Sequence, residues 1–190
     1  MAQPIPYKDE KLKNAICFFA NEHEKLTRKP LSQTFLYKYL AFLDFKSIED
    51  TGRPAIGLTY MAMKRGPVPM ELYGKRNELK DDCFVFIPQE EGRVIIKAIG
   101  EPDMDYFSPY EITEMKRLIE IYADYFVTTS DISEASHESI KAWRKAFGKK
   151  ENSIIDYDLV FDDDILDKKE GSLTYAEESY LLYKAIKKAC

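Results

Sequence analysis

The segment FLYKYLAFLDF, residues 35–45, places apolar side chains on more than one face of a helix. A helix that is apolar almost all round is usually covered on every side, at the centre of a domain. Ser32 before the segment is a suitable N-cap residue. The turn sequence Thr51-Gly52-Arg53-Pro54 follows it. We therefore predict a central helix that begins at Ser32 and ends near Asp50.

Further helices are predicted around this centre. Residues 10–25 carry apolar side chains at the i, i+3, i+4, i+7 positions of an amphipathic helix, and His23 extends this stripe as a packing residue. Ser108-Pro109-Tyr110-Glu111 combines a serine N-cap, a proline in the first turn and a glutamate at the capping-box position. The helix that begins there is predicted to break at Thr128-Thr129-Ser130-Asp131.

Two more helices are expected toward the C-terminal end. In the first, Ser136 is predicted to be the N-cap, and it shares one stripe with Ile140, Trp143 and Phe147. This stripe places Trp143 in the core. Residues 174–188 are predicted to form a terminal helix, because a threonine and a glutamate stand at capping-box spacing at its start.

The segments between residues 55 and 99 predict the β-structure. Residues 84–87 and 93–99 are β-branched and aromatic runs separated by a loop with a glycine, which indicates a hairpin that packs on helices or joins a third short strand. Residues 58–64 are predicted to form a short helix that ends at Gly66, and Gly66-Pro67-Val68-Pro69 is predicted to be a stiff extended elbow. The predicted fold class is therefore α+β: a predominantly helical single domain with a small antiparallel hairpin or sheet.

Composition limits the class of protein. The 190 residues are 45% hydrophobic and 13% aromatic, which fits one globular domain or a domain with an appendage. No apolar run reaches the ~18 residues of a membrane helix, and the N-terminal residues lack the apolar core of a signal peptide, so we expect a cytoplasmic protein without a membrane partner. Cys17, Cys83 and Cys190 form no CxxC pair, so we predict no disulfide framework, no metal site and no cofactor.

Charge is distributed unevenly along the chain. The net charge is −5, and residues 151–190 carry all of it, with ten acids and five bases. The acidic run from Asp156 to Asp167 lacks the central glycine and the terminal glutamate of a calcium loop. It is either a solvated loop or a contact surface for a basic partner. We assign residues 1–150 to one domain and residues 151–190 to an acidic loop and a C-terminal helix packed on or extending it.

Ser136-His137 is the first place to look for nucleophilic catalysis. Neighbouring side chains on a helix diverge by about 100 degrees, so an adjacent serine and histidine do not form a catalytic dyad. The chain also lacks the sequence motifs of α/β-hydrolases, zinc proteases, P-loop proteins and dinucleotide-binding domains. We therefore predict a structural or interface role for His137, no catalytic residues and no enzymatic activity.

DNA binding is the second hypothesis. A helix at residues 32–48, a short helix at 59–65 and a hairpin at 84–99 follow the order of a winged helix-turn-helix. In that arrangement Lys64 and Arg65 would contact DNA from the short helix, and Arg93 and Lys97 from the wing. However, residues 61–82 contain five bases and four acids, which is too balanced for a strong phosphate-binding surface. A regulator of its own promoter remains the alternative function.

Three segments together resemble a known family. They are residues 35–45, residues 52–69, and Ser136-His137 with Ala142-Trp143. They are similar to the Panacea domain, the SocA-like antitoxin family that includes phage-associated GepA-like proteins. The signature positions are Gly52, Arg53, Pro54, Gly57, Tyr60, Lys64, Gly66, Pro67, Val68, Pro69, Ser136, His137 and Trp143.

The chain departs from the family pattern in two places. Arg65 stands where an aromatic residue is common. Five residues rather than three separate His137 from Trp143. The second departure argues against a paired role of the histidine and the tryptophan.

The resemblance implies a mainly helical fold with a small sheet and no catalytic activity. It implies an antitoxin that binds and neutralises a toxin protein encoded by an adjacent gene. Some members resemble proteolytic adaptors that deliver the toxin to a ClpXP-type protease. The aromatic content of this chain suits protein interfaces, and its acidic C-terminal segment would speed association with a basic toxin.

Overall fold

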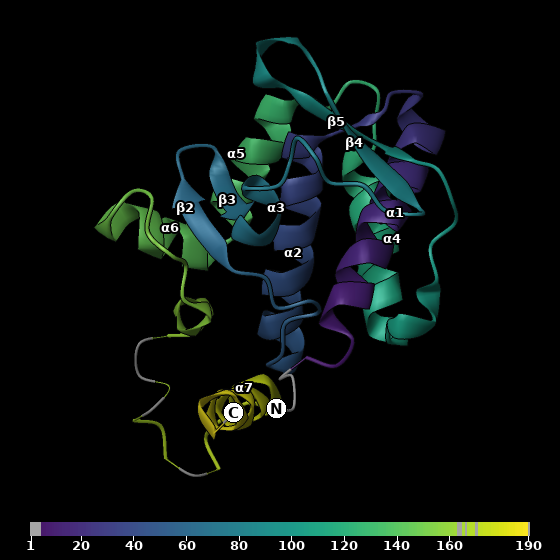
Figure 1. Cartoon of the computed structure of the whole chain (residues 1–190). Helices are drawn as coiled ribbons and strands as arrows, with labels where there is room; N and C mark the ends of the chain where they lie inside the picture. Colours follow the sequence, from purple (N-terminus) through teal and green to yellow (C-terminus); the bar gives the residue numbers. More distant parts are fainter. Residues whose placement is uncertain (1–4, 163–164, 166, 170, 190) are drawn as a thin grey trace.

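A computed structural model describes residues 5–162, 165, 167–169 and 171–189 (Figure 1). Helix α2, Gln33–Thr51, runs through the middle of the molecule, and every side chain from Phe35 to Phe45 is buried. Its N-cap Ser32 accepts a hydrogen bond from the backbone N–H of Phe35, and Gly52 ends it in the left-handed conformation. The predicted central helix is confirmed.

Helices cover α2 on several sides. Helices α1, Lys8–Thr27, and α4, Pro109–Tyr122, lie together on one side of α2, as Figure 1 shows. The capping box of Ser108 and Glu111 is present at the start of α4. His23 is 4% exposed and its Nδ1 is 3.0 Å from the Tyr39 hydroxyl, so its predicted packing role is confirmed.

The next two helices differ from their prediction. Helix α4 ends at Tyr122, before the predicted break, and Thr128 instead forms with Asp131 a capping box that begins α5, Thr129–Ser139. Ser136 therefore lies inside α5 and is not an N-cap. The backbone of Ile140 leaves the helical region and begins α6, Lys141–Lys149. The predicted stripe from Ser136 to Phe147 is thus divided between two helices.

Two small antiparallel sheets complete the fold. Strands β4, Phe84–Pro88, and β5, Val94–Ala98, form the predicted hairpin around the 3₁₀ turn Glu90–Gly92, and β1, Leu31–Ser32, adds the third short strand. Ile96 pairs with Phe86 on one side and with Leu31 on the other. This sheet lies against α1, with its β5 strand also next to α2.

The second sheet corrects a prediction. Residues 60–63 form strand β2, Tyr60–Met63, and not a short helix; β2 pairs with β3, Gly66–Pro69. Tyr60 and Ala62 are buried while Met61 and Met63 are half-buried, which is the alternation of a strand. The extended elbow at Gly66–Pro69 is confirmed, and it is this elbow that offers β2 a partner. A one-turn helix, α3, Met70–Tyr73, follows.

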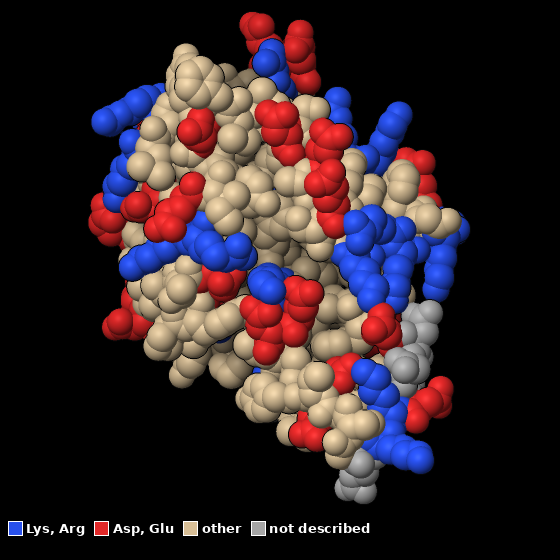
Figure 2. All heavy atoms as spheres, turned by 180° about the vertical axis from the view of Figure 1, so that it is seen from behind, with Lys and Arg blue, Asp and Glu red and all other residues tan. Residues whose placement is uncertain are grey.

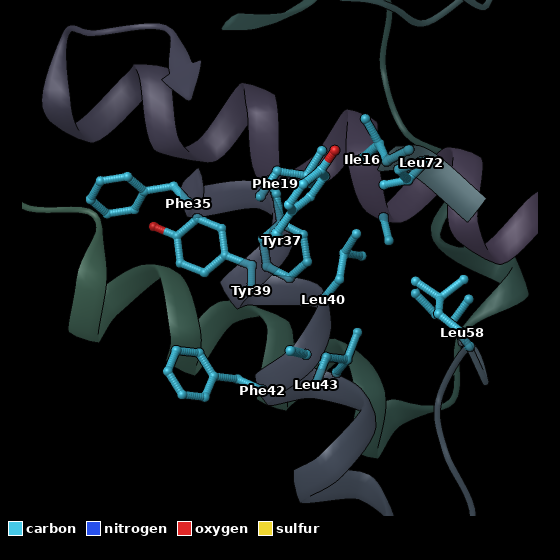
Figure 3. Packing of buried hydrophobic residues seen from close by; sticks show 14 of the residues in the cluster. Ile16, Phe19, Phe35, Tyr37, Tyr39, Leu40, Phe42, Leu43, Leu58 and Leu72 are labelled. Atoms are coloured by element: carbon cyan, nitrogen blue, oxygen red, sulfur yellow. The ribbon is translucent and has the colours of Figure 1, made fainter. Parts of the chain in front are cut away.

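Aromatic side chains from several elements fill the core (Figure 3). The Phe19 ring of α1 stacks on the Tyr39 ring of α2, with ring centroids 4.8 Å apart. The Phe42 ring of α2 stacks on the Tyr122 ring of α4 at 5.0 Å. Because α2 contributes to both stacks, it connects the two flanking helices through one continuous core.

The C-terminal residues pack at the far end of α2. Helix α7, Tyr175–Ala189, lies below α2 in Figure 1, and Tyr180 and Tyr183 form a smaller buried cluster with Ile48. The predicted capping pair is present, since the Thr174 N–H donates to Glu177 Oε2 at 2.8 Å. The acidic run contains the 3₁₀ turn Tyr157–Val160, while Asp163 and Asp164 lie outside the described residues. Within the described part of the chain, no helix is long and apolar enough to cross a membrane.

Candidate functional site

The loop between α2 and β2 is organised by one buried carboxylate. Asp44 is fully buried, and its Oδ1 accepts hydrogen bonds from the N–H groups of Ile56 at 2.6 Å and Gly57 at 3.0 Å. Its Oδ2 accepts from the Leu58 N–H at 3.1 Å and from the Tyr60 hydroxyl at 3.0 Å. Burial raises the pKa of Asp44, and these hydrogen bonds act in the opposite direction. All four of these partners are donors, so the geometry suits the ionised carboxylate.

A buried lysine attaches the elbow to α2. Lys38 is 2% exposed, and its Nζ donates to the Pro67 carbonyl oxygen of β3 at 3.1 Å. Burial lowers the pKa of Lys38 to about 7, because the charged ammonium has left water. Gly66 lies directly against this lysine and against Ser136 of α5. A Cβ at Gly66 would be 2.5 Å from Ser136 Oγ, so no larger residue fits between the elbow and α5.

His137 of α5 and Trp143 of α6 pack against the β2–β3 hairpin from the side opposite α2. The Trp143 ring is 6% exposed, and its Nε1 donates to the Met63 carbonyl oxygen of β2 at 3.1 Å. The His137 ring stacks on Trp143 with centroids 4.0 Å apart and an angle of 6° between the planes. The longer spacing in the sequence therefore does not separate these residues, because the bend at Ile140 turns the indole back over the imidazole. Trp143 is a core residue, as predicted.

These contacts bring together segments that are far apart in the sequence. Residues 60–69 lie against α2 on one side and against α5 and α6 on the other. Tyr157, from the acidic segment, adds a hydrogen bond to the Leu58 carbonyl oxygen at 2.6 Å. We call the group of Lys38, Asp44, Tyr60, Gly66, Ser136, His137 and Trp143 the signature cluster.

A comparison with known protein families identifies the family of this chain. The family model described as antitoxin SocA-like, Panacea domain, matches residues 36–144, which run from α2 into α6. The chain belongs to the Panacea domain family. No curated protein and no solved structure matches the chain. All signature positions lie inside the matched span, as do Lys38 and Asp44.

Sequence reasoning about the Panacea pattern missed two members of the cluster. Lys38 and Asp44 lie within the apolar segment 35–45, yet each is an ionisable residue among buried neighbours. That contrast was the available signal, because a charge within a helix that is apolar all round must find a partner inside the protein. Tyr157 carried no comparable signal, since its partners come from residues about a hundred positions earlier.

The remaining signature positions of this Panacea domain shape the backbone. Gly52 is the C-terminal cap of α2, and the Arg53 carbonyl oxygen accepts from Ser47 Oγ at 2.7 Å while the Arg53 side chain is exposed. Pro54 is buried, and Gly57 has φ of 77° beside the Asp44 carboxylate. Val68 and Pro69 lie on β3, whose residues are all buried. These residues hold the loop and the elbow rather than a reacting group.

The residues of the DNA-binding alternative are separated. Lys64 and Arg65 are exposed on the turn between β2 and β3, and Arg93 and Lys97 are exposed on the other hairpin. Arg93 pairs with Glu91 at 2.9 Å. The short recognition helix that this hypothesis required is wrong, because the segment pairs as a strand.

Two hollows border the Panacea core. The first, which we call the hydroxyl pocket, has a volume of about 510 Å³ and is lined by polar side chains of the β2–β3 turn, the start of α2 and one face of α5. The second, the apolar hollow, has a volume of about 290 Å³ and lies between α2, α4 and the α5–α6 junction. Its apolar lining includes Phe42, Phe45, Leu118, Tyr122 and Ile140. Figure 2, the view from behind Figure 1, shows an uncharged, hollowed area in the middle of the molecule with charged side chains around it.

One group of potential metal ligands occurs among the described residues. Asp81, Asp82 and Cys83 present ligand atoms within 4.8 Å of one another. The Lys13 ammonium already contacts both carboxylates, at 2.7 Å from Asp81 Oδ1. A lysine therefore stands where a cation would have to bind.

Proposed function

We propose that this chain is an antitoxin that binds its toxin protein directly and neutralises it without a catalytic step. The observation that carries the proposal is the match of the SocA-like antitoxin family over residues 36–144, the residues that build the signature cluster. The cluster itself supports a binding protein. Its hydrogen bonds are used to hold the elbow and the loop, and the histidine next to Ser136 is stacked on an indole.

The apolar hollow is the surface that we assign to the toxin. Tightly binding interfaces have an apolar centre, often filled by one anchoring side chain of the partner, and a polar rim that excludes water. The hollow has both parts. Its centre contains the Phe42–Tyr122 stack, and its rim carries Lys46, Arg117 and Lys141, each held in a salt bridge. A toxin that inserts an apolar or aromatic side chain fits this shape.

Co-expression tests the proposal. The product of the adjacent gene is expressed alone and together with this chain, and growth and co-purification are measured. We expect arrest with the neighbour alone, rescue by this chain and a stable complex of the two proteins. A harmless neighbour, or rescue without any complex, would contradict the proposed function.

A filled hollow tests the surface. Ser139 is exposed on the lining, so Ser139→Trp places an indole in the hollow without changing a buried residue. We expect this variant to lose the complex and the rescue. Ser172→Trp is the matched control, because Ser172 is exposed outside this hollow. If both variants rescue growth equally, another surface binds the toxin.

The same experiment separates neutralisation from delivery to a protease. In a host that lacks the ClpXP-type protease, direct neutralisation predicts unchanged rescue and unchanged toxin levels. An adaptor predicts that the toxin accumulates and that rescue is lost. Promoter repression predicts lower toxin messenger RNA and no complex, so all three routes give different results.

A further inference from the structure

The hydroxyl pocket is a polar hollow with an excess of positive charge. Lys64 and Arg65 project from the β2–β3 turn into its lining, and neither forms a salt bridge within the described residues. Glu134 is the acid among the lining residues. Lys38, buried near this wall, adds positive charge in its protonated form. Burial, and then the nearby Lys38, lower the pKa of His137, which lines the same pocket.

Hydrogen-bond donors converge on the same space. Thr129 and Ser130 line the pocket and form the first turn of α5, a helix of 11 residues. The Asp131 N–H bonds to Thr128 Oγ1 and the Ile132 N–H to the Thr128 carbonyl oxygen. The N–H groups of Thr129 and Ser130 precede these and have no acceptor among the described residues. The first N–H groups of a helix attract negative charge.

A buried atom in the wall is also without a partner. The Nε2 of His137 is shielded from solvent and makes no hydrogen bond in the described structure. Its ring is held in place by the stack on Trp143, which the Met63 carbonyl oxygen fixes in turn. One cavity is thus bordered by two cationic side chains of the β2–β3 turn, by backbone N–H donors of the first turn of α5, and by a histidine ring that Trp143 of α6 holds in place.

We propose that the hydroxyl pocket binds the phosphate group of a small phosphate ester, such as a nucleoside monophosphate. A carboxylate has two acceptor oxygens, whereas a phosphate group can accept from a lysine, an arginine, two hydroxyls and helix N–H groups together. A cavity of about 510 Å³ lies in the usual range of small-molecule sites and has room for an organic part beside the phosphate. This site is independent of the proposed toxin surface.

Calorimetric titration of the full chain tests the proposal, with inorganic phosphate and adenosine monophosphate as separate probes in phosphate-free buffer. We expect saturable binding to one site, with the monophosphate ester tighter than the free ion. The double variant K64E/R65E should weaken binding by about tenfold or more. R93E/K97E is the matched control, since it reverses one arginine and one lysine on the other hairpin. Its affinity should stay within about twofold of wild type.

Nuclear magnetic resonance shows where the probe binds. A bound anion should shift the amide signals of Thr129 and Ser130 and raise the pKa of His137, because negative charge favours the imidazolium form. Should K64E/R65E unfold at a lower temperature than R93E/K97E, T129V/S130A replaces it, because this variant removes only the hydroxyls. Its affinity should then fall while both anchoring cations remain.

Three outcomes would overturn the proposal. The first is the absence of saturable binding for both probes at millimolar concentration. The second is an equal loss in K64E/R65E and R93E/K97E, which would indicate a general effect of net charge. The third is binding of phosphorylated oligonucleotides that strengthens with length and moves no signal of α5, which would indicate a nucleic-acid surface instead of a pocket.

Discussion

Asp44 is the residue on which the loop between α2 and β2 depends. Its two oxygens accept from three consecutive backbone N–H groups, those of Ile56, Gly57 and Leu58, and from the Tyr60 hydroxyl. A buried N–H without a partner costs about 1–3 kcal/mol. A single carboxylate thus fixes the backbone that leads into the elbow.

Asp44→Asn should reduce the free energy of unfolding by about 2 kcal/mol or more. Whichever way the amide turns, its NH₂ group faces at least one backbone N–H. Urea unfolding measures the effect. Glu49→Gln is the control: the Glu49 carboxylate is 64% exposed beside Lys46, and the change should cost less than about 0.5 kcal/mol. Equal stability of both variants would mean that the loop does not need this charge.

His23 predicts a pH dependence. Burial, and then Lys29, lower the pKa of His23 to about 4, whereas an unfolded histidine titrates near 6.5. Between these values the unfolded chain binds a proton that the folded chain excludes. Stability from this residue is therefore complete above about pH 6.5 and falls as the pH drops toward 4, by up to about 3 kcal/mol.

His23→Gln should remove this dependence and still give the Tyr39 hydroxyl a partner. Urea unfolding between about pH 7 and pH 4 should show the variant gaining about 2–3 kcal/mol relative to wild type as the pH falls. His137→Gln is the comparison. The pKa of His137 is lowered in the same direction, but its ring is less buried, so the relative gain should be smaller. Parallel curves for wild type and H23Q would refute the assignment.

At the scale of elements, the β2–β3 hairpin is held between α2 and α5 by close contact. Gly66 has φ of 97° and leaves no room for a Cβ between Ser136 Oγ and Lys38. Gly92 has φ of 69° in the other hairpin, but no atom lies within 4 Å of its Cβ position. A substitution at Gly92 therefore reports backbone strain alone, whereas a substitution at Gly66 reports strain together with a steric clash.

Gly66→Ala should cost about 2 kcal/mol more than Gly92→Ala, which should cost about 1 kcal/mol from strain alone. Thermal unfolding of both variants measures the difference. The double variant G66A/S136A should recover part of the lost stability, because it removes Ser136 Oγ, the nearest of the clashing atoms. Equal losses at both glycines would show that the elbow tolerates a wider gap.

At the scale of the whole molecule, α7 is joined to the Panacea domain through the end of α2. A Cβ at Gly52 would be 2.2 Å from the Ala176 carbonyl oxygen and 2.6 Å from the Tyr180 nitrogen, both backbone atoms of α7. The acidic segment is also used within the chain. Asp158 pairs with Lys184 and Asp162 with Lys141, so these two acids already have basic partners.

Gly52→Ala should displace α7, because neither backbone atom can move without the helix. Hydrogen exchange should show faster exchange in α7, while α2 keeps its protection. Gly171→Ala is the control, since its φ of 85° is equally strained and its Cβ position is open. Loss of protection throughout the chain would instead mean that α7 and the Panacea domain unfold as one unit.

The sequence by itself determined the helical framework and the family. The all-round apolar segment at residues 35–45 predicted the central helix, and Ser108 with Glu111 and Thr174 with Glu177 predicted helix starts. These signals are local, because capping and periodicity involve residues within one or two turns. The signature pattern also predicted the family, and the match over residues 36–144 confirmed it.

Only the tertiary structure decided how those residues meet. Tyr60–Met63 became a strand because Gly66–Pro69 offered it a partner, and no local propensity contains that pairing. Lys38, Ser136 and Trp143 are joined through the β2–β3 hairpin by contacts across 29 to 80 positions of sequence. The sequence shows that Lys38 and Asp44 lie within an apolar helix, but it does not show which groups they bind. Spacing describes a single element, whereas burial and hydrogen bonding between elements depend on how all of them pack.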